Sequence, residues 1–241
     1  MKKFYLTSAL ALMLLPSLAV AQTMTREQVE NIIKDYIQNN PEVILDAVEA
    51  YGIEQQQADF EAQQKAVQDH LGWLENNDML PVAGNPDGDV TIIEFFDYNC
   101  GYCKKALGDV MKLLESDKNL KFVLVDMPIL GRMSETAAKW AMAAKEQDAY
   151  MEYHIALMES SGMITDQKLE QIAEKIGLNV EKMRTDSKSK AIADKLALKS
   201  AKAAEMGISG TPAFIIDGQL YGGYIGLDKM REAVAQARSE G

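Results

Sequence analysis

Two cysteines, Cys100 and Cys103, are the only ones in a chain of 241 residues, and just two positions separate them. An apolar run, Val90 to Phe96, precedes the pair, and a helical pattern from Gly101 to about Ser116 follows it. A cysteine pair at the turn from a strand into a helix is typical of a redox centre. A disulfide between the two would close a very small loop, and the stabilisation that a disulfide provides grows with loop length. We therefore expect thiol–disulfide chemistry here, with a local structural bridge as the alternative.

The first 21 residues have the pattern of a secretory signal peptide. Lys2 and Lys3 give a positive start, Leu6–Leu15 is a short apolar core, and Ala19–Ala21 is a cleavage site of small residues. The apolar core is too short to span a membrane, and an uncleaved anchor is the alternative. We therefore predict cleavage after Ala21 and export to the periplasm, an oxidising compartment.

Composition limits the partners and the metal chemistry. The chain has 25 basic and 36 acidic side chains and a formal net charge of −11, which argues against binding to nucleic acid. A closed zinc site needs four ligands, and only His70 and His154 could join the two cysteines. Both histidines lie far from the cysteines in sequence, so we interpret each as an ordinary surface or core residue. No cofactor and no metal site is expected.

Residues 22–80 are predicted to form a helical segment of their own. Thr25 and the glutamine three residues later have the spacing of a capping box, and apolar residues at helical spacing follow in Val29–Ile37. A second helix is predicted to begin at Asn40-Pro41, with the asparagine as its N-cap and the proline as its first helical residue. A second apolar face then covers Val43–Tyr51. Two short amphipathic helices are the expected result.

Beyond Gly52 the sequence turns polar and rich in glutamine, so a separate, solvent-exposed helix is predicted up to about Leu80. Short helices with an apolar face cannot bury much on their own, so these faces need a partner. Packing onto the rest of the chain is one alternative. We favour self-association into a homo-oligomer, either a dimer or a trimer, because a complete second domain follows. The turn-rich stretch 81–89 marks the predicted start of that domain, 81–241.

The second domain is predicted to be α/β. Val90–Phe96 is a buried strand, Gly101–Ser116 a helix, and Phe122–Val125 a strand without alternation, as in a parallel strand buried on both faces. A helical insertion covers about residues 132–206, and a hairpin with its turn at Asp217-Gly218 follows. The predicted insertion helices are Ser134–Lys145, Ala149–Glu159, Gln167–Ile176 and Val180–Ala204; the hairpin strands are Thr211–Ile216 and Leu220-Tyr221, and the last helix is Asp228–Arg238.

The two cysteines are predicted to have different roles. At the N-terminus of a helix, unpaired N–H groups and the helix dipole favour an anion, so Cys100 is the predicted nucleophile. Cys103 lies one turn further in and is the predicted resolving thiol. Glu94 shares a strand face with Ile92 and Phe96, and a carboxyl in such an apolar place could accept or supply the proton of Cys103. The alternative for Glu94 is a residue exposed at a sheet edge without a role.

The order strand, CxxC, helix, strand, helical insertion, Gly-Thr-Pro, hairpin and helix resembles the thioredoxin fold in its DsbA-like form. The resemblance covers about Val82 to the C-terminus, and Glu94 lies six residues before Cys100, as the buried glutamate of DsbA lies before its first cysteine. It implies an α/β thioredoxin fold with an inserted helical domain, preceded by an N-terminal helical oligomerisation segment. It also implies that Pro212 is a cis-proline beside the active site, with Thr211 offering backbone contacts to substrate.

The residues between the cysteines indicate which DsbA-like proteins the chain resembles. Gly101-Tyr102, together with the later Gly210-Thr211-Pro212, resembles the dimeric isomerase DsbC, so Gly101 and Tyr102 are further expected substrate contacts. The N-terminal helices resemble those of oligomeric DsbA-like proteins, including the suppressor-of-copper-sensitivity C group. DsbA itself carries Pro-His between its cysteines, which this chain lacks. The resemblance therefore implies isomerase or reductase activity rather than simple oxidase behaviour.

The leading prediction is a periplasmic thiol–disulfide oxidoreductase that acts chiefly as a disulfide isomerase. Its expected partners are secreted proteins that are unfolded or carry wrong disulfides, and a membrane redox partner that keeps Cys100 reduced. A DsbA-like oxidase, served by an oxidising membrane partner, is the first alternative. A protein that handles Cu(I) through both thiolates is the second, and a chaperone or scaffold with idle cysteines is the third.

Overall fold

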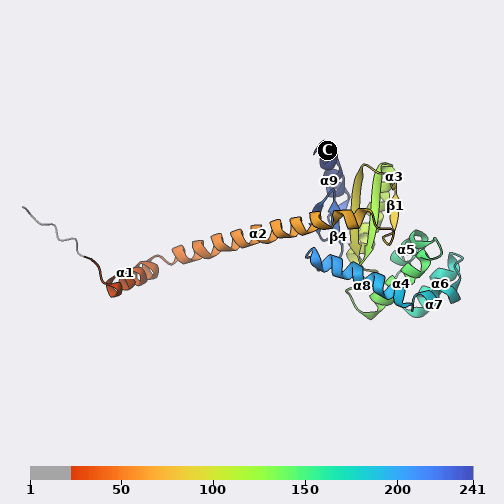
Figure 1. The fold of residues 1–241 in the computed structure, drawn as a ribbon, viewed down its shortest axis with the longest axis horizontal. Coiled ribbons are helices and arrows are strands. Elements are labelled where there is room, and N and C mark those ends of the chain that lie inside the picture. Colours follow the sequence, from red (N-terminus) through yellow and green to blue (C-terminus); the bar gives the residue numbers. More distant parts are fainter. Residues whose placement is uncertain (1–22, 241) are drawn as a thin grey trace, which may run out of the picture. The chain divides into compact units, whose positions relative to one another are not determined.

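The computed structural model of the protein describes residues 23–240 (Figure 1). The predicted signal peptide, residues 1–21, lies outside the described residues. Backbone contacts divide the chain into two units, and the division falls between Gln55 and Gln56. Among the described helices, none combines the length and the apolarity that a bilayer crossing requires.

The first described helix, α1 (Arg26–Asn39), begins with the predicted capping box. The Thr25 backbone N–H donates to Gln28 Oε1 at 2.9 Å, and the Gln28 N–H donates to Thr25 Oγ1 at 3.3 Å. No residue of α1 is buried. The next helix, α2 (Glu42–Glu75), starts in the first unit and ends in the second, and its buried residues, Val67 and Leu74, both belong to the second.

Two expectations for these helices are wrong. Asn40 does not cap the second helix, because its Nδ2 donates to the Tyr36 carbonyl at 2.8 Å and so completes the end of α1. The predicted change of helix after Gly52 does not occur either, since α2 continues through Gly52 to Glu75. One glycine costs a helix only about 1 kcal/mol relative to alanine, which is too little to end a long helix of otherwise good helix formers.

The second unit is built on a mixed five-stranded sheet in the order β1-β3-β2-β4-β5. The strands are β1 (Val82–Gly84), β2 (Val90–Phe96), β3 (Leu120–Asp126), β4 (Ala213–Ile216) and β5 (Gln219–Gly222). The central strand β2 runs parallel to β3 and antiparallel to β4, and β4 joins β5 through Asp217 and Gly218, both with positive φ. The predicted strands and hairpin are thus confirmed. The sequence pattern does not predict β1, because the three residues of this strand lie in a turn-rich stretch.

The remaining helices are α3 (Gly101–Ser116), α4 (Arg132–Lys145), α5 (Tyr150–Met158), α6 (Asp166–Lys175), α7 (Val180–Asp186), α8 (Lys190–Glu205) and α9 (Gly226–Glu240). Helices α4 to α8 form the expected insertion between β3 and β4, and Figure 1 shows them gathered beside the sheet. The single helix predicted over residues 180–204 is wrong, because the chain breaks between α7 and α8. There Ser189 Oγ accepts the Ile192 N–H at 3.3 Å and caps the new helix.

Each face of the sheet packs against its own apolar cluster. The face of β2 that carries Ile92 and Phe96 is covered by α3, α9 and the helical insertion. The opposite face, which carries Ile93 and Phe95, is covered by the end of α8 and by the last turns of α2, with Val67 and Leu74 of α2 in this cluster. The last part of α2 is therefore a core element of the second unit.

A buried ion pair joins the insertion to the sheet. Lys199 Nζ, on α8, lies 2.6 Å from Asp126 Oδ2 at the end of β3, and both side chains are buried. The Tyr150 hydroxyl, on α5, donates to the other oxygen of Asp126 at 3.0 Å. Removing one partner of such a pair costs about 3–5 kcal/mol, because the other charge is left buried and uncompensated. Asp126 is the β3 residue opposite Phe96, so the pair fixes the insertion next to the loop that carries Cys100.

Candidate active site

Cys100 and Cys103 lie where β2 turns into α3, as predicted. Cys100 is the N-cap of α3, and its Sγ accepts the Cys103 backbone N–H at 3.2 Å. Both cysteines are free; Cys100 is 6 % exposed and Cys103 is fully buried. Cys100 thus has the two features expected of the predicted nucleophile, a backbone N–H donor and a helix N-terminus. It is also the more exposed of the two cysteines.

A buried carboxylate, Asp97, holds the loop that carries Cys100. Asp97 Oδ1 accepts the Asn99 N–H at 2.8 Å, and Oδ2 accepts the Leu130 N–H at 2.9 Å from the loop before α4. The Asn99 side chain donates to Ser134 Oγ at 2.9 Å. Sequence reasoning missed these contacts, although an aspartate directly after a buried strand is a recognisable signal. Together they fix the start of α3 against the helical insertion.

The loop before β4 forms the second part of the site. The Thr211–Pro212 peptide bond is cis, as the resemblance implies. The Cys100 Sγ–H donates to the Thr211 carbonyl at 3.3 Å, so two segments 111 residues apart in sequence meet at the sulfur atom. The structure thus brings Cys100, Thr211 and Pro212 together, while contact of the last two with substrate stays a prediction.

Glu94 lies below the cysteines in the central strand, β2. It pairs with Leu124 on one side and with Phe214 on the other, and it is 3 % exposed, so the alternative of a residue at a sheet edge is wrong. Its Oε1 is buried and has no hydrogen-bond partner among the described residues. Burial raises the pKa of Glu94 from 4.5 to about 8. This carboxyl group can therefore hold a proton at neutral pH and release it close to neutrality.

The buried Cys103 thiol is held in its protonated form. Burial raises its pKa well above the ordinary value of 9.0, and the hydrogen bond with Cys100 and the charge of Glu94 act in the same direction. Cys103 and Glu94 are thus close enough for the charge of one to affect the protonation of the other. All three residues predicted to be catalytic, Cys100, Cys103 and Glu94, come together at one end of β2.

Tyr102, the second residue between the cysteines, faces solvent. It is 65 % exposed, and its ring stacks on Tyr224 with centroids 6.2 Å apart and an interplanar angle of 22°. Lys105 Nζ lies 4.5 Å from the centre of the Tyr224 ring. Gly101 is also exposed, and a Cβ there would meet no atom within 4 Å. The surface beside Cys100 is therefore open on the side of Gly101 and Tyr102.

The two histidines have ordinary structural contacts, as predicted. His154 is buried, with Nδ1 3.1 Å from the Tyr98 hydroxyl, and burial lowers the pKa of His154 to about 4. His70 Nδ1 lies 2.8 Å from the Ala66 carbonyl, and its Nε2 lies 2.7 Å from Glu205. Over residues 23–240, no group of three or more His, Cys, Asp and Glu side chains is arranged to hold a metal ion.

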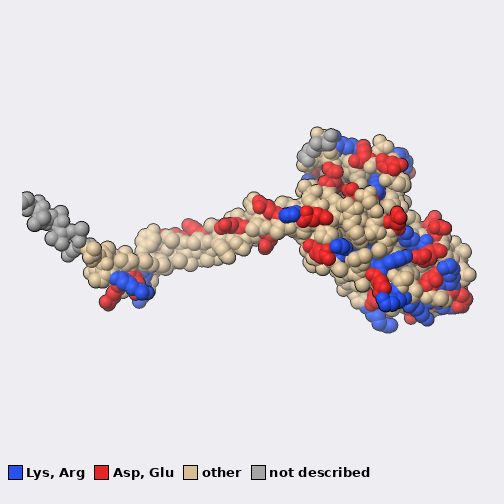
Figure 2. All heavy atoms as spheres, viewed as in Figure 1, with Lys and Arg blue, Asp and Glu red and all other residues tan. Residues whose placement is uncertain are grey.

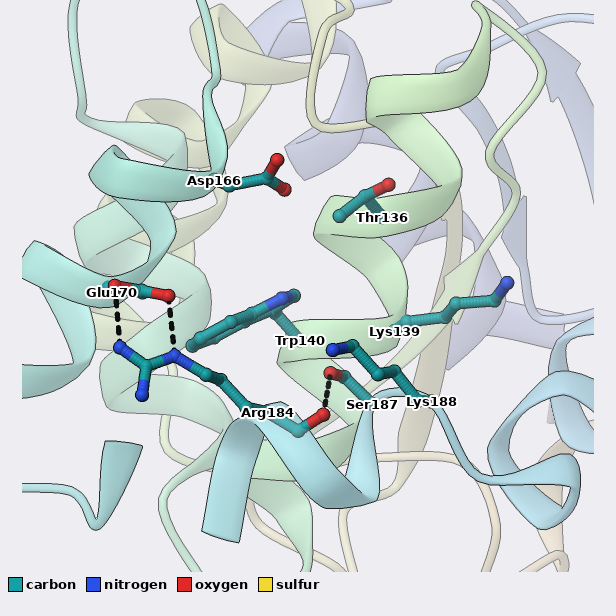
Figure 3. A pocket seen from close by; sticks show the side chains of 8 residues that line it. All are labelled: Thr136, Lys139, Trp140, Asp166, Glu170, Arg184, Ser187 and Lys188. Carbon is teal, nitrogen blue, oxygen red and sulfur yellow. Dashed lines mark hydrogen bonds and ion pairs between the residues drawn. The ribbon is translucent and has the colours of Figure 1, made fainter. Parts of the chain in front are cut away.

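A cavity of about 580 Å³ in the helical insertion contains none of the predicted site residues (Figure 3). Its lining is charged, but Arg184 donates from Nε and Nη2 to the two carboxylate oxygens of Glu170 at 2.7 and 2.8 Å. Figure 3 shows this ion pair beside Trp140. Because Arg184 and Glu170 satisfy each other and the cavity contains neither cysteine, we place the reactive site at the cysteines and not in this cavity.

We predict that replacing Glu94 by glutamine changes how stability depends on pH. Because the pKa of Glu94 is about 8 in the folded chain and 4.5 when unfolded, the folded state holds an extra proton between these values. Through this group the unfolding free energy should fall by about 1.4 kcal/mol per pH unit as the pH rises through this window, and Glu94→Gln should lack this loss. Urea unfolding between about pH 5 and about pH 8 measures the difference.

The control for this measurement is Glu174→Gln, which changes an exposed carboxyl group on α6. It should keep the pH dependence of the unmodified chain. Equal slopes for Glu94→Gln and the unmodified chain would contradict the raised pKa of Glu94.

Comparison with known proteins gives two family matches. Residues 91–235 match the family described as DSBA-like thioredoxin domain. This match includes Glu94, both cysteines, Thr211 and Pro212. Residues 26–66 match the family described as copper resistance protein ScsC N-terminal domain, which covers α1 and much of α2.

Solved structures agree with the first match. A thioredoxin-like oxidoreductase from Silicibacter pomeroyi is 38 % identical and has a TM-score of 0.68, covering 70 % of this chain and 98 % of its own. The thiol-disulfide exchange protein alpha-DsbA2 from Wolbachia pipientis is 26 % identical with a TM-score of 0.68, covering 74 % of this chain and 97 % of its own. The matches confirm the thioredoxin fold with a helical insertion.

Curated relatives include proteins much longer than this chain. The Na(+)/H(+) antiporter NhaA 1 of Salinispora arenicola is 28 % identical over 158 residues, which is 65 % of this chain but 24 % of the antiporter. The chain thus spans about a quarter of the length of this relative. This match assigns no transport function to the chain. From the family match and the solved structures together, the chain belongs to the DSBA-like thioredoxin domain family of thiol–disulfide oxidoreductases.

Proposed function

We propose that the protein is a periplasmic thiol–disulfide oxidoreductase that acts chiefly as a disulfide isomerase, and also as a reductase, on secreted proteins. The observation that carries the proposal is the Cys103 N–H donated to Cys100 Sγ at the start of α3. An N–H donor at a helix N-terminus is a general means of favouring a nucleophilic thiolate, and an isomerase needs its first cysteine in that reduced form. Similarity to alpha-DsbA2 of Wolbachia pipientis, a thiol-disulfide exchange protein, supports the same chemistry.

Isomerisation on this site needs no net transfer of electrons. The Cys100 thiolate attacks one sulfur of a wrong client disulfide, so a Cys100–client disulfide forms and the other client sulfur leaves as a thiolate. That thiolate, or another in the client, then attacks a further client disulfide. Finally a client thiolate attacks the client sulfur bound to Cys100, which forms the new client disulfide and releases the Cys100 thiolate.

Reduction uses Cys103 and Glu94 as well. The Cys103 thiol gives its proton to Glu94 when Glu94 is ionised. Because the pKa of Glu94 is about 8, a fraction of the Glu94 side chains is ionised near neutral pH and can accept that proton. The Cys103 thiolate then attacks Cys100 Sγ, and the client sulfur leaves as a thiolate. Two electrons have passed to the client, and the Cys100–Cys103 disulfide remains to be reduced by a redox partner.

We predict that Cys103→Ala traps clients on Cys100. Because attack by Cys103 is intramolecular, its loss should lengthen the life of the mixed disulfide by on the order of a thousandfold. Acid quenching after mixing with a disulfide-bonded client, followed by mass spectrometry, measures the trapped species. Cys100→Ala is the matched control and should form none. Rapid formation of a mixed disulfide on Cys103 in that control would reverse the two roles.

The first unit presents a large exposed apolar surface, called here the association surface. Its large apolar side chains are Val29, Ile32, Ile33, Tyr36, Val43, Ile44, Leu45, Val48, Tyr51 and Ile53. On the face seen in Figure 2, the first turns of α2 are mostly uncharged. Exposed apolar area of this extent marks an interaction site. We infer self-association into a dimer or a trimer, which would hold several Cys100 thiolates around one client.

We predict that charges placed on the association surface lower isomerase activity. Ile33→Glu combined with Val48→Glu should give the mass of a single chain in light scattering, because each carboxylate would have to be buried between subunits. Reactivation of scrambled ribonuclease should fall about tenfold, since a client loses the neighbouring thiolates. Lys34→Glu, on the polar side of α1, is the control. Full activity of the single-chain variant would contradict the role of self-association.

The redox state in the cell separates an isomerase from an oxidase. An isomerase needs a membrane reductant that returns Cys100 and Cys103 to thiols, whereas an oxidase needs a membrane oxidant that returns them to a disulfide. We predict mostly reduced cysteines. Acid quenching of cells followed by alkylation of free thiols measures the ratio, with chemically reduced and oxidised protein as references. Mostly oxidised cysteines would establish a DsbA-like oxidase instead.

A further inference from the structure

A groove beside Cys100 has walls that the steps above do not use. A cavity of about 480 Å³ lies between residues 207–213, the end of β5 and the turn of α2 that carries Phe60 and Gln63. Thr211 lines this cavity, and its carbonyl accepts the Cys100 Sγ–H. The groove therefore starts at Thr211, the residue in contact with the reactive sulfur, and leads toward α2. All of these residues belong to the second unit, which begins at Gln56.

Glycines at two positions keep the groove open. Gly210 and Gly222 do not have a positive φ, and a Cβ at either position would meet no atom within 4 Å. Neither backbone conformation nor packing therefore requires glycine there. Both residues line the groove, so a side chain at either would take up its volume. By contrast, a Cβ at Gly207, which has positive φ, would lie 3.0 Å from the Gln63 side chain.

Phe60 forms the wall of the groove that comes from α2. It is 55 % exposed, and three residues later Gln63 Nε2 donates to the Gly207 carbonyl at 3.0 Å, which holds this turn against the loop. None of the described residues that line the cavity is charged, although the chain has a net charge of −11. A second cavity, of about 590 Å³, shares Phe60, Gln63 and Gly207 with the first, so the groove continues along α2. Asp59 and Glu205 also line this second cavity, so the groove is uncharged only in the part beside Thr211.

We propose that this groove binds the client segment next to the cysteine that Cys100 attacks, and that Phe60 contacts a bulky apolar side chain of that segment. The part of the groove beside Thr211 is uncharged and has the aromatic wall, so it fits an uncharged, apolar stretch of an extended polypeptide. The inference rests on the proposed exchange function and adds a substrate class to it. That class is disulfide-bonded polypeptides with a large apolar residue near the reacting cysteine.

The test uses peptides whose single cysteine forms a disulfide with glutathione. The reduced full chain reduces each peptide–glutathione disulfide to the peptide thiol and glutathione, while Cys100 and Cys103 form a disulfide. The second-order rate constant of this reduction is measured. Paired peptides carry phenylalanine or glycine at one of the positions flanking the cysteine. We expect the best phenylalanine peptide to react about tenfold faster than its glycine counterpart, and Phe60→Ala to remove this preference.

Two further variants make the test specific. Gly222→Val fills the groove from β5 and should also remove the preference for phenylalanine. Phe60→Leu keeps a large apolar side chain and should retain most of it. Leu198→Ala is the matched control, because it changes an exposed apolar residue of α8 that does not line the groove. This variant should keep the preference for phenylalanine.

Failure of the inference differs from failure of the proposed function. If no peptide pair shows a preference, or if both Phe60→Ala and Gly222→Val keep it, the groove does not bind the client and the inference is overturned. If Phe60→Ala keeps the preference and changes the mass of the assembly in light scattering, a second copy occupies the groove, which also overturns it. If neither glutathione disulfide nor the glycine peptides oxidise the reduced chain, the exchange function itself is wrong.

Discussion

The position of the reactive sulfur depends on a carboxylate that is buried from solvent. Asp97 accepts backbone N–H groups from the loop that carries Cys100 and from the loop that leads into α4. A buried charge without hydrogen bonds destabilises a fold strongly, so both loops must be in place for the carboxylate to be satisfied. Formation of the helix N-terminus at Cys100 is therefore coupled to docking of the insertion, and the site forms only when the two parts of the second unit meet.

The end of the sheet beneath the cysteines holds two buried carboxyl groups with opposite surroundings. Asp126 has the Lys199 ammonium and the Tyr150 hydroxyl within hydrogen-bond distance, which fixes its place in the structure. Glu94 lies among apolar side chains, and burial raises its pKa to about 8. Asp126 stabilises the fold, because breaking its contacts leaves an unpaired buried charge. Glu94 keeps a proton that can move, because nothing else in the described structure binds its Oε1.

Features with a local cause could be predicted from the sequence. The junction at the cysteines, the Thr25 capping box and the Asp217-Gly218 turn each depend on a few neighbouring residues, and the structure has all three. Glu94 could be identified because a lone acid within an apolar strand breaks the pattern of its neighbours.

Features that depend on distant contacts could not be predicted in the same way. The side chain of Asn40 can close one helix or open the next, and geometry rather than residue type decides between them. The pairing of Lys199 with Asp126 joins residues 73 apart, and a lysine in a helix is normally assigned to the surface. The Phe60 wall likewise depends on how α2 lies against the loop before β4, which no periodicity in α2 reveals.

Both cysteines of the chain lie at the reactive site, so no other part of the fold is held by sulfur. Its cores are closed by apolar packing and by the ion pair at Asp126, and a thiolate can attack neither. In an assembly that brings several nucleophilic sulfur atoms together, structural disulfides would themselves be open to exchange. This chain has no structural disulfide. It can pass through repeated oxidation and reduction without a structural disulfide taking part in the exchange.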